Sequence, residues 1–405
     1  MEINIDEKKI DELLRRSIKE ILPTREELKK ELLSGRKLRI YNGTDATGTS
    51  LHLGHATNYM ILEKFRQLGH EVIFLIGDFT SRIGDPTDKS ATRVPLTREQ
   101  VIANTQTWLN QVKPLVAIND PVNPVKILYN HDWLSKLTFE DVIDIASNFT
   151  VQQMLERDMF EKRMAENKPI HLHEFFYPLM QGYDSVHMDV DIELCGNDQK
   201  FNALAGRHLM KRMKNKEKFV FITTLLENPK TGEKMMSKSL GTGVFLDWSA
   251  DQMFGGIMAQ ADENIHQLFT DCTYVPEEQI LDIEVGMQNG ENPMIYKKRL
   301  AREIVTIYHG ASAAEIAQTN WEKAFSEGGV PDEIPELTAN QGDLLVDVLV
   351  SNAIIATKAE FRRLVDEGAI KTMSDQEEKI SDPKFTITQS AVFKIGKRRF
   401  VKINI

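Results

Sequence analysis

Two histidines separated by two residues lie near the start of the chain, in the stretch SLHLGHATN. His52 and His55 follow a β-like run, residues 38–44, and His55 opens a helix-like run, residues 55–69. The first turn of a helix has free backbone N–H groups that favour an anion. Imidazole donors at this junction therefore predict a phosphate site. Two histidines at this spacing are also compatible with a metal site or with chance.

A second candidate phosphate-binding segment is EKMMSKSLG, residues 233–241. Lys238 lies between Ser237 and Ser239 in a stretch flanked by glycines, which is typical of a loop with a cationic tip. Such a loop can close over a triphosphate and offset the charge that develops as pyrophosphate departs. Lys238 alone would be interpreted as an exposed surface lysine, and the two histidines favour the phosphate interpretation.

Three polar side chains at helical spacing form a further candidate site in FFYPLMQGYD. Tyr177, Gln181 and Asp184 occupy positions i, i+4 and i+7, which share one face of a helix. A polar stripe among apolar neighbours either faces solvent or lines a polar pocket. A phenol, an amide and a carboxylate are suited to binding a small zwitterion.

The elements that would position these residues alternate between strand-like and helix-like runs up to residue 226. This order predicts an α/β domain with a Rossmann-type, doubly wound parallel sheet. Residues 7–34 are typical of two short amphipathic helices interrupted near Pro23. The predicted strands are residues 38–44, 71–77, 125–129, 189–194 and 219–223.

The sheet domain, residues 1–226, is predicted to contain a mostly helical insertion at about 96–168. The apolar faces of this insertion suit either an internal core or a dimer contact. Beyond the sheet domain the pattern predicts a lysine-bearing loop with an all-helical domain, then a linker rich in glycine, proline and acidic residues, then a small α+β domain. Their expected bounds are residues 227–328, 329–342 and 343–405.

The composition restricts the class of protein. The chain has 405 residues, a net charge of −10 and two cysteines. Its length predicts several domains, and two cysteines predict a cytoplasmic protein without disulfides. The sequence also predicts no membrane span and no signal peptide. From residue 341 onward 11 Lys and Arg stand against 9 Asp and Glu, whereas the rest is acidic. This asymmetry indicates an RNA-contacting C-terminal module, with a solvated basic tail as the alternative. No metal site is predicted, because HLHE at residues 171–174 lacks a third ligand nearby.

HLGH and MSKS on this α/β framework resemble the class I aminoacyl-tRNA synthetases. The resemblance implies a site that activates an amino acid with ATP, accompanied by Mg²⁺, and then acylates tRNA. His52, His55 and Lys238 would contact the ATP phosphates, and Lys89 and Arg93 of GDPTDKSATR would share that role. Met235 stands where the family has the first lysine of its loop, so Lys234, one place upstream, is a candidate substitute.

The finer motifs YNGTDATGTSLHLGH, IGDPTDKSATR, FFYPLMQGYD and GNDQ are similar to those of the tyrosyl-tRNA synthetase family. That similarity implies that Tyr41 and Asp184 bind the phenol hydroxyl of tyrosine. The ammonium group of tyrosine would be held by Tyr177, Asp85 and Gln181, with Gln199 also contacting the amino acid. Thr47 would join the histidines in catalysis, and the remaining ATP contacts would come from Gly43, Asp45, Gly54, Asp198, Met236, Ser237 and Ser239.

The stretch TKAEFRRLVDEGAIK resembles an S4 RNA-binding domain and begins with a capping box at Thr357 and Glu360. The resemblance to the tyrosyl-tRNA synthetase family implies a homodimer that binds tRNA(Tyr) and has no membrane contact. Three alternatives remain open: the tryptophanyl enzyme, a non-catalytic RNA-binding relative and a small-molecule adenylyltransferase. The expected contacts to tRNA phosphates are Arg362, Arg363, Lys397, Arg398 and Arg399.

Overall fold

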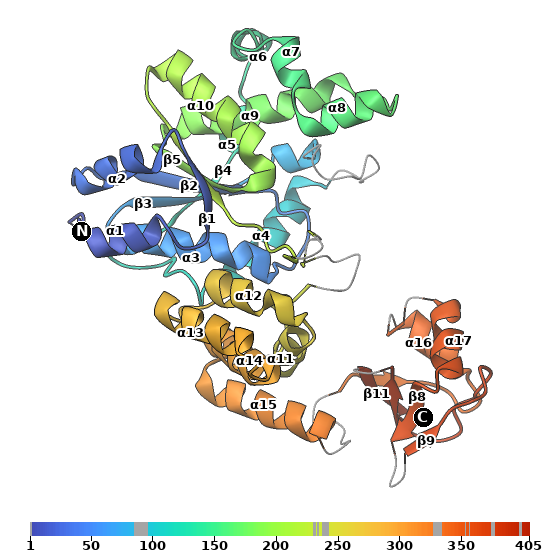
Figure 1. The fold of residues 1–405 in the computed structure, drawn as a ribbon. Helices are drawn as coiled ribbons and strands as arrows, with labels where there is room; N and C mark the ends of the chain where they lie inside the picture. The colour runs from blue at the N-terminus through green and yellow to red at the C-terminus, as the bar shows by residue number, and fades with distance from the viewer. Residues whose placement is uncertain are drawn as a thin grey trace. The chain divides into compact units, whose positions relative to one another are not determined.

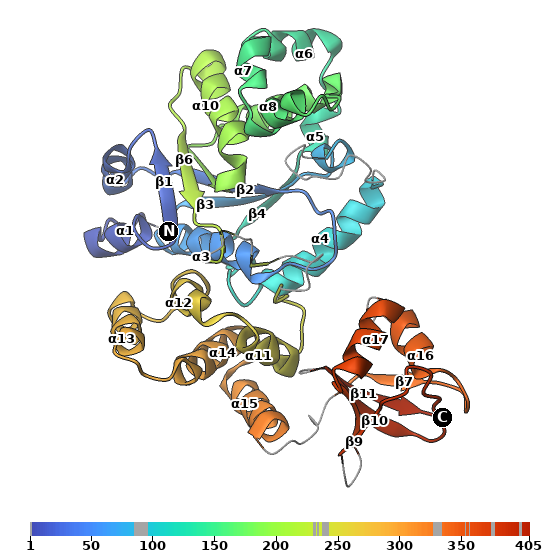
Figure 2. The same cartoon turned by 45° about the vertical axis from the view of Figure 1, so that its right-hand side comes forward.

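The computed structural model forms two compact units, Met1–Ala311 and Ser312–Ile405 (Figures 1 and 2). Within the described residues no helix has both the length and the apolar character needed to cross a membrane. The structure describes residues 2–84, 96–229, 243–326, 334–352, 354–355, 357–373, 377–396 and 399–405, together with Gly232, Met235 and Met236.

The first unit is built around a six-stranded sheet with the order β1-β6-β5-β2-β3-β4. All neighbouring pairs are parallel except β1 with β6. The strand order changes direction between β2 and β5, so the carboxyl ends of these two strands border a crevice of the kind that binds ligands in open α/β sheets. The predicted parallel sheet is confirmed: its strands are β2 (Arg39–Thr44), β3 (Glu71–Ile76), β4 (Lys126–Tyr129), β5 (Ile192–Gly196) and β6 (Phe219–Thr223).

Helices cover both faces of this sheet, and for that reason the inner strands β3 and β6 are almost entirely apolar. In β3 every residue after Glu71 is buried. Figures 1 and 2 show α3 (Leu53–Gln67) on one face, and α9 (Phe176–Met188) with α10 (Lys200–Lys214) on the other. Tyr41, Ile73 and Val190 belong to a core cluster that includes side chains from β2 and β3.

Residues 7–34 contain the two predicted helices, but a strand that was not predicted lies between them. The elements are α1 (Glu7–Leu13), β1 (Ile18–Leu22) and α2 (Arg25–Leu33). β1 pairs antiparallel with β6, with Leu22 opposite Val220 and an irregularity between Ile18 and Glu20. The sequence IKEIL lacks a strict strand alternation, so its conformation depends on pairing with a distant strand.

Between β4 and β5 the chain forms α5 (His131–Leu134), α6 (Phe139–Ala146), α7 (Val151–Leu155), α8 (Asp158–Ala165) and η2 (Leu172–Phe175). This helical segment starts later than the insertion expected at about 96–168. The preceding α4 (Arg98–Val112) leads from β3 to β4 and is part of the sheet's own connections. The helical period is the same in a crossover and in an insertion, so the sequence pattern does not separate the two.

The region after β6 is helical as predicted. Its elements are α11 (Ala250–Met258), η4 (Asp262–Asn264), α12 (Ile265–Cys272), α13 (Glu277–Gln288), α14 (Pro293–His309) and α15 (Ala311–Ser326). Two further short helices, η1 (Thr80–Arg82) and η3 (Asn197–Gln199), lie earlier, in the sheet region. Arg16, which follows α1, donates to the carbonyls of Thr270 at 2.8 Å and Phe269 at 3.0 Å, in the last turn of α12. A guanidinium at the C-terminal end of α12 satisfies carbonyls that the helix leaves unpaired.

The second unit contains α15 from Ser312 onward and, after it, α16 and α17 with a five-stranded sheet of order β7-β11-β10-β8-β9. Leu345, Phe361 and Phe393 are buried in its own core. Thr357 Oγ1 accepts from the Glu360 backbone N–H at 3.1 Å, as the capping motif predicts. The elements are β7 (Glu336–Thr338), α16 (Leu345–Ser351), α17 (Lys358–Asp366), β8 (Ile370–Met373), β9 (Glu377–Lys379), β10 (Ala391–Ile395) and β11 (Arg399–Asn404).

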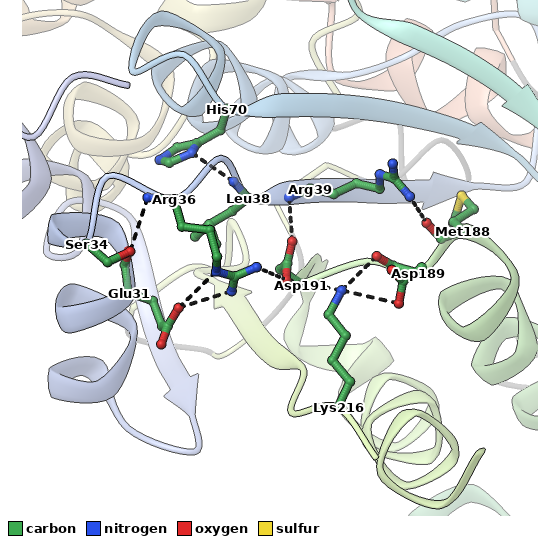
Figure 3. A network of polar contacts seen from close by, with 10 residues as sticks. All are labelled: Glu31, Ser34, Arg36, Leu38, Arg39, His70, Met188, Asp189, Asp191 and Lys216. Carbon is green, nitrogen blue, oxygen red and sulfur yellow. Dashed lines mark hydrogen bonds and ion pairs between the residues drawn. The ribbon is translucent and has the colours of Figure 1, made fainter. Parts of the chain in front are cut away.

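A network of polar contacts joins the amino-terminal ends of the central strands (Figure 3). The buried Asp191 carboxylate accepts from the Arg39 backbone N–H and from the Arg36 guanidinium, both at 2.8 Å, and pairs with Lys216 at 3.2 Å. The His70 ring is fully buried beside this network, and its Nδ1 accepts from the Leu38 backbone N–H at 3.3 Å. These contacts fix the starts of β2 and β5 at the sheet edge opposite the crevice.

We expect His70 to make the fold acid-sensitive. Burial lowers its pKa to about 4, with Lys37 and Arg36 adding to the effect and Asp191 opposing it. In the unfolded chain His70 binds a proton near pH 6.5, whereas in the folded chain it does not. The contribution of neutral His70 to the free energy of unfolding is therefore complete above about pH 6.5. It is lost as the pH falls toward 4, by up to about 3 kcal/mol. Urea unfolding at pH 7, 6 and 5 should show a flatter profile for His70→Asn, and an unchanged profile would contradict this assignment.

Candidate active site

The predicted phosphate-binding histidines lie at the start of α3. His52 precedes the helix in an extended conformation, and its backbone N–H donates to His55 Nδ1 at 3.2 Å. The two ring centroids are 3.9 Å apart. Both imidazoles thus lie at the first turn of α3, where the positive end of the helix dipole favours an anion.

The segments that flank the predicted lysine loop pair with the histidine segment. Leu53 N donates to Val244 O at 3.0 Å, and Leu246 N donates to Leu51 O at 2.9 Å. His52 and Phe245 form the antiparallel bridge between these bonds. The histidine motif is therefore joined by backbone hydrogen bonds to residues 244–246, which follow the lysine motif in the sequence. Met236, at the other end of the loop, also lies here, because the Val244 N–H contacts its Sδ at 3.4 Å.

Tyr41 on β2 and Asp184 on α9, the two residues expected to bind the phenol hydroxyl of tyrosine, define the proposed phenol pocket. Tyr41 is 0% exposed and Asp184 is 2% exposed. The Asp184 carboxylate accepts from Trp133 Nε1 at 2.8 Å and from Asn130 Nδ2 at 3.2 Å. Burial raises the pKa of Asp184, while the bonds from Asn130 and Trp133 lower it. Burial also raises the pKa of Tyr41, so its hydroxyl keeps its proton and can donate.

A second polar cluster links Tyr177 with Asp45. Tyr177 Oη donates to Asp45 Oδ2 at 3.0 Å, and Thr80 Oγ1 donates to Asp45 Oδ1 at 2.7 Å. A side chain at Gly77 would place its Cβ only 1.9 Å from Asp45 Oδ1, so a glycine there is required for this contact. Tyr177 was expected to bind the amino acid and Asp45 the nucleotide, and the structure brings the two together.

The other predicted residues near the crevice fall into three groups. Gly43, at the end of β2, and Thr47, just beyond it, are exposed, as is Asp198 in η3. Gln181 Nε2 donates to Glu193 Oε1 at 2.9 Å, and Gln199 Oε1 accepts from Asn202 at 2.9 Å. The predicted residues that lie outside the described part of the chain are Asp85, Lys89, Arg93, Lys234, Ser237, Lys238, Ser239, Lys397 and Arg398.

Within the second unit, the basic residues of the predicted RNA face differ in exposure and in hydrogen-bond partners. Arg362 and Arg363 on α17 are exposed. Arg399 instead donates to Glu360 Oε1 and to Ile354 O, both at 2.7 Å. The guanidinium of Arg399 therefore has internal partners in this unit, which the count of basic residues does not reveal.

The comparisons with known proteins agree with this geometry. The model of the family described as tRNA synthetases class I (W and Y) matches residues 33–326. A tyrosine–tRNA ligase of Carboxydothermus hydrogenoformans is 43% identical over 405 residues, with 97% of each chain covered. The chain belongs to the tyrosyl-tRNA synthetase family. Tyrosine–tRNA ligase 2 of Vibrio parahaemolyticus is 41% identical over 393 residues, again with 97% of each chain covered.

Among solved structures, the tyrosyl-tRNA synthetase fold is shared at lower identity. The C-terminally truncated mitochondrial tyrosyl-tRNA synthetase of Coccidioides posadasii gives a TM-score of 0.62 at 24% identity. The alignment covers 77% of this chain and 90% of that one. This likeness supports the mixed α/β arrangement around the parallel sheet.

Sequence reasoning missed several buried partners in this tyrosyl-tRNA synthetase-family site. Asn130 directly follows a predicted strand, yet nothing in the sequence links it to Asp184, 54 residues away. Glu193 and Lys218 offered a stronger signal, since opposite charges inside or beside apolar strand runs must find partners when buried. The groups missed are Asn130, Trp133, Ser185, Glu193 and Lys218.

Proposed function

We propose that this chain activates L-tyrosine with ATP and transfers the tyrosyl group to tRNA(Tyr). The observation that carries the proposal is the burial of Tyr41 on β2 and Asp184 on α9, the two residues expected to bind the phenol hydroxyl. A site that buries a hydroxyl donor and a carboxylate acceptor leaves both unpaired when phenylalanine enters. The resulting discrimination is about 10⁵ in the tyrosyl-tRNA synthetase example that illustrates this rule.

The proposed first step is attack by the tyrosine carboxylate on the α-phosphorus of ATP. A carboxylate oxygen–phosphorus bond forms, the bond to the bridging oxygen breaks, and pyrophosphate leaves. This step needs positioning and charge stabilisation, not a protein nucleophile. His52, His55 and Thr47 would stabilise the developing charge together with Lys238, Lys89 and Arg93. A hydroxyl of the terminal tRNA ribose then attacks the tyrosyl carbonyl carbon, and AMP leaves.

Mg²⁺ is proposed to enter with ATP. Among the described residues no group of three or more His, Cys, Asp or Glu side chains could hold a metal ion. Magnesium commonly binds through substrate phosphates and few protein carboxylates. The exposed Asp198 at the crevice is one carboxylate that fits this mode. The ion would neutralise phosphate charge.

Amino-acid-dependent exchange of pyrophosphate into ATP tests the proposed activity. We expect exchange with tyrosine and at most trace exchange with tryptophan or phenylalanine. Faster exchange with tryptophan would support the tryptophanyl alternative, which the tyrosine–tRNA ligase relatives do not favour. A folded sample without any exchange would support the non-catalytic RNA-binding alternative.

The second unit is proposed to act as an S4-like RNA-binding domain. Arg362 and Arg363 are exposed on one helix, where two guanidinium groups suit adjacent phosphates. Replacing both with glutamate should weaken tRNA binding and leave pyrophosphate exchange unchanged. Lys397 and Arg398 are proposed to contribute, and Arg399 to support the fold through Glu360.

A homodimer is proposed to form through the helices between β4 and β5. Large apolar side chains are exposed there, with Phe139 at 81% and Leu172 at 74%. Exposed apolar side chains on one segment are typical of an interaction surface. Sedimentation of the wild type and of Phe139→Asp tests this surface. We also propose a cytoplasmic location, because both cysteines are free thiols within the core.

A further inference from the structure

A lysine and a glutamate form a buried ion pair behind the phenol pocket. Lys218 is 0% exposed and Glu193 is 2% exposed, and the Lys218 ammonium donates to Glu193 Oε2. Burying two charges is costly, and replacing such a pair with apolar side chains is often neutral or stabilising. A role in stability alone therefore does not explain why this fold has a buried charge pair here.

The pair contacts the phenol pocket through one hydroxyl. Lys218 Nζ donates to Ser185 Oγ at 3.0 Å, and Ser185 Oγ lies 2.9 Å from Tyr41 Oη. The ammonium has three donors and no acceptor, so the Ser185 oxygen accepts from it. Ser185 then directs its own proton to Tyr41, the other polar group in contact with it here. Tyr41 in turn directs its proton away from Ser185, toward a bound substrate or toward the Glu193 carboxylate, which is a second acceptor beside the Tyr41 hydroxyl.

The same pair orients the side chain proposed to bind the ammonium group. Gln181 Nε2 donates to Glu193 Oε1 at 2.9 Å. A carboxylate only accepts, so Gln181 must turn its NH₂ toward Glu193, and its carbonyl oxygen faces the other way. That oxygen is the end of the amide that can accept from a substrate ammonium.

The space for this arrangement depends on the close approach of α9 and α10. A Cβ at Gly206 would lie 2.5 Å from Lys218 Nζ and 3.0 Å from Ser185 Oγ. Glycine at this position of α10 therefore leaves room for the ammonium between the two helices. Figures 1 and 2 show the two helices side by side on one face of the sheet.

We propose that Lys218 and Glu193 are positioning residues for tyrosine selectivity. Their ion pair sets the hydrogen-bond direction through Ser185, so that Tyr41 donates to the substrate phenol oxygen while Asp184 accepts from its proton. Through Gln181 the same pair orients the acceptor for the ammonium group. This inference rests on the proposed tyrosine activation.

The test removes both charges together, because either single change would leave an uncompensated buried charge. In the double variant Lys218→Met with Glu193→Gln, we expect the ratio of kcat/KM for tyrosine over phenylalanine to fall about tenfold. KM for tyrosine should rise, while KM for ATP stays unchanged. The matched control is Arg207→Met with Glu217→Gln, a partly exposed pair bridging α10 and the segment before β6, at 2.5 Å. The control should keep wild-type selectivity.

A second variant tests the relay with the ion pair intact. Ser185→Ala should lower selectivity to a similar extent, and adding the double variant should cause little further loss, because interactions in one chain are not additive. Wild-type selectivity in Ser185→Ala, or fully additive losses, would overturn the inference. Failure of the proposed function differs from either result, because the wild type itself would then show no tyrosine-dependent exchange.

Discussion

Replacing His55 with alanine is expected to slow tyrosine-dependent pyrophosphate exchange about 100-fold, with little change in tyrosine affinity. The His55 ring lies in the first turn of α3, 3.9 Å from the His52 ring by centroid distance. A donor there would act on phosphate charge that grows in the transition state. Such an interaction lowers kcat when lost and leaves ground-state amino acid binding intact.

Single-turnover measurement of tyrosyl-adenylate formation, with tyrosine binding followed separately, checks this expectation. The matched control is His266→Asn, because His266 is half-exposed and pairs with Glu284 on α13 at 3.5 Å. The control should retain the wild-type rate. A His55→Ala variant that matched the wild-type rate would exclude a role for this imidazole in charge stabilisation.

The central strands were predictable because their physical cause is local. A parallel strand covered on both faces is a run of apolar residues, and EVIFLI at Glu71–Ile76 is such a run. β1 has no comparable local signal, since IKEIL becomes a strand by pairing with β6, about 200 residues later. The helical period of α4 was equally uninformative about its place in the sheet connections.

In the candidate site, too, residues with a local sequence signal were predictable, and residues that depend on contacts between distant elements were not. Tyr41 and Asp184 were identified by residue type and motif, and the structure buries both. Their supporting groups come from other elements: Trp133 from α5 and Ser185 from α9. Spacing within one helix cannot indicate such contacts, because they depend on how the helices cross. Arg399 shows the converse, since its pairing with Glu360 was hidden among basic neighbours.

Asp184→Asn is expected to reduce the selectivity for tyrosine over phenylalanine more than the Lys218 and Glu193 double variant does. We expect the ratio of kcat/KM for tyrosine over phenylalanine to fall at least about 100-fold, because an asparagine has one acceptor where the carboxylate has two. Trp133 Nε1 and Asn130 Nδ2 already donate to the two Asp184 oxygens. The NH₂ group of the new amide cannot accept a hydrogen bond. It would either face one of these donors or take the place of the oxygen that accepts from the substrate hydroxyl. Parallel exchange assays with tyrosine and phenylalanine measure the ratio.

Asp191→Asn is the matched control for the loss of a buried carboxylate. Asp191 is 4% exposed and lies at the opposite ends of the strands, where it binds Arg36 and Arg39. Losing a charge-assisted hydrogen bond there should cost about 1–3 kcal/mol of stability without changing selectivity. If Asp184→Asn behaved like this control, losing stability while the folded fraction kept its preference for tyrosine, Asp184 would be a structural carboxylate. Loss of selectivity in Asp184→Asn alone would place the discrimination at the substrate hydroxyl.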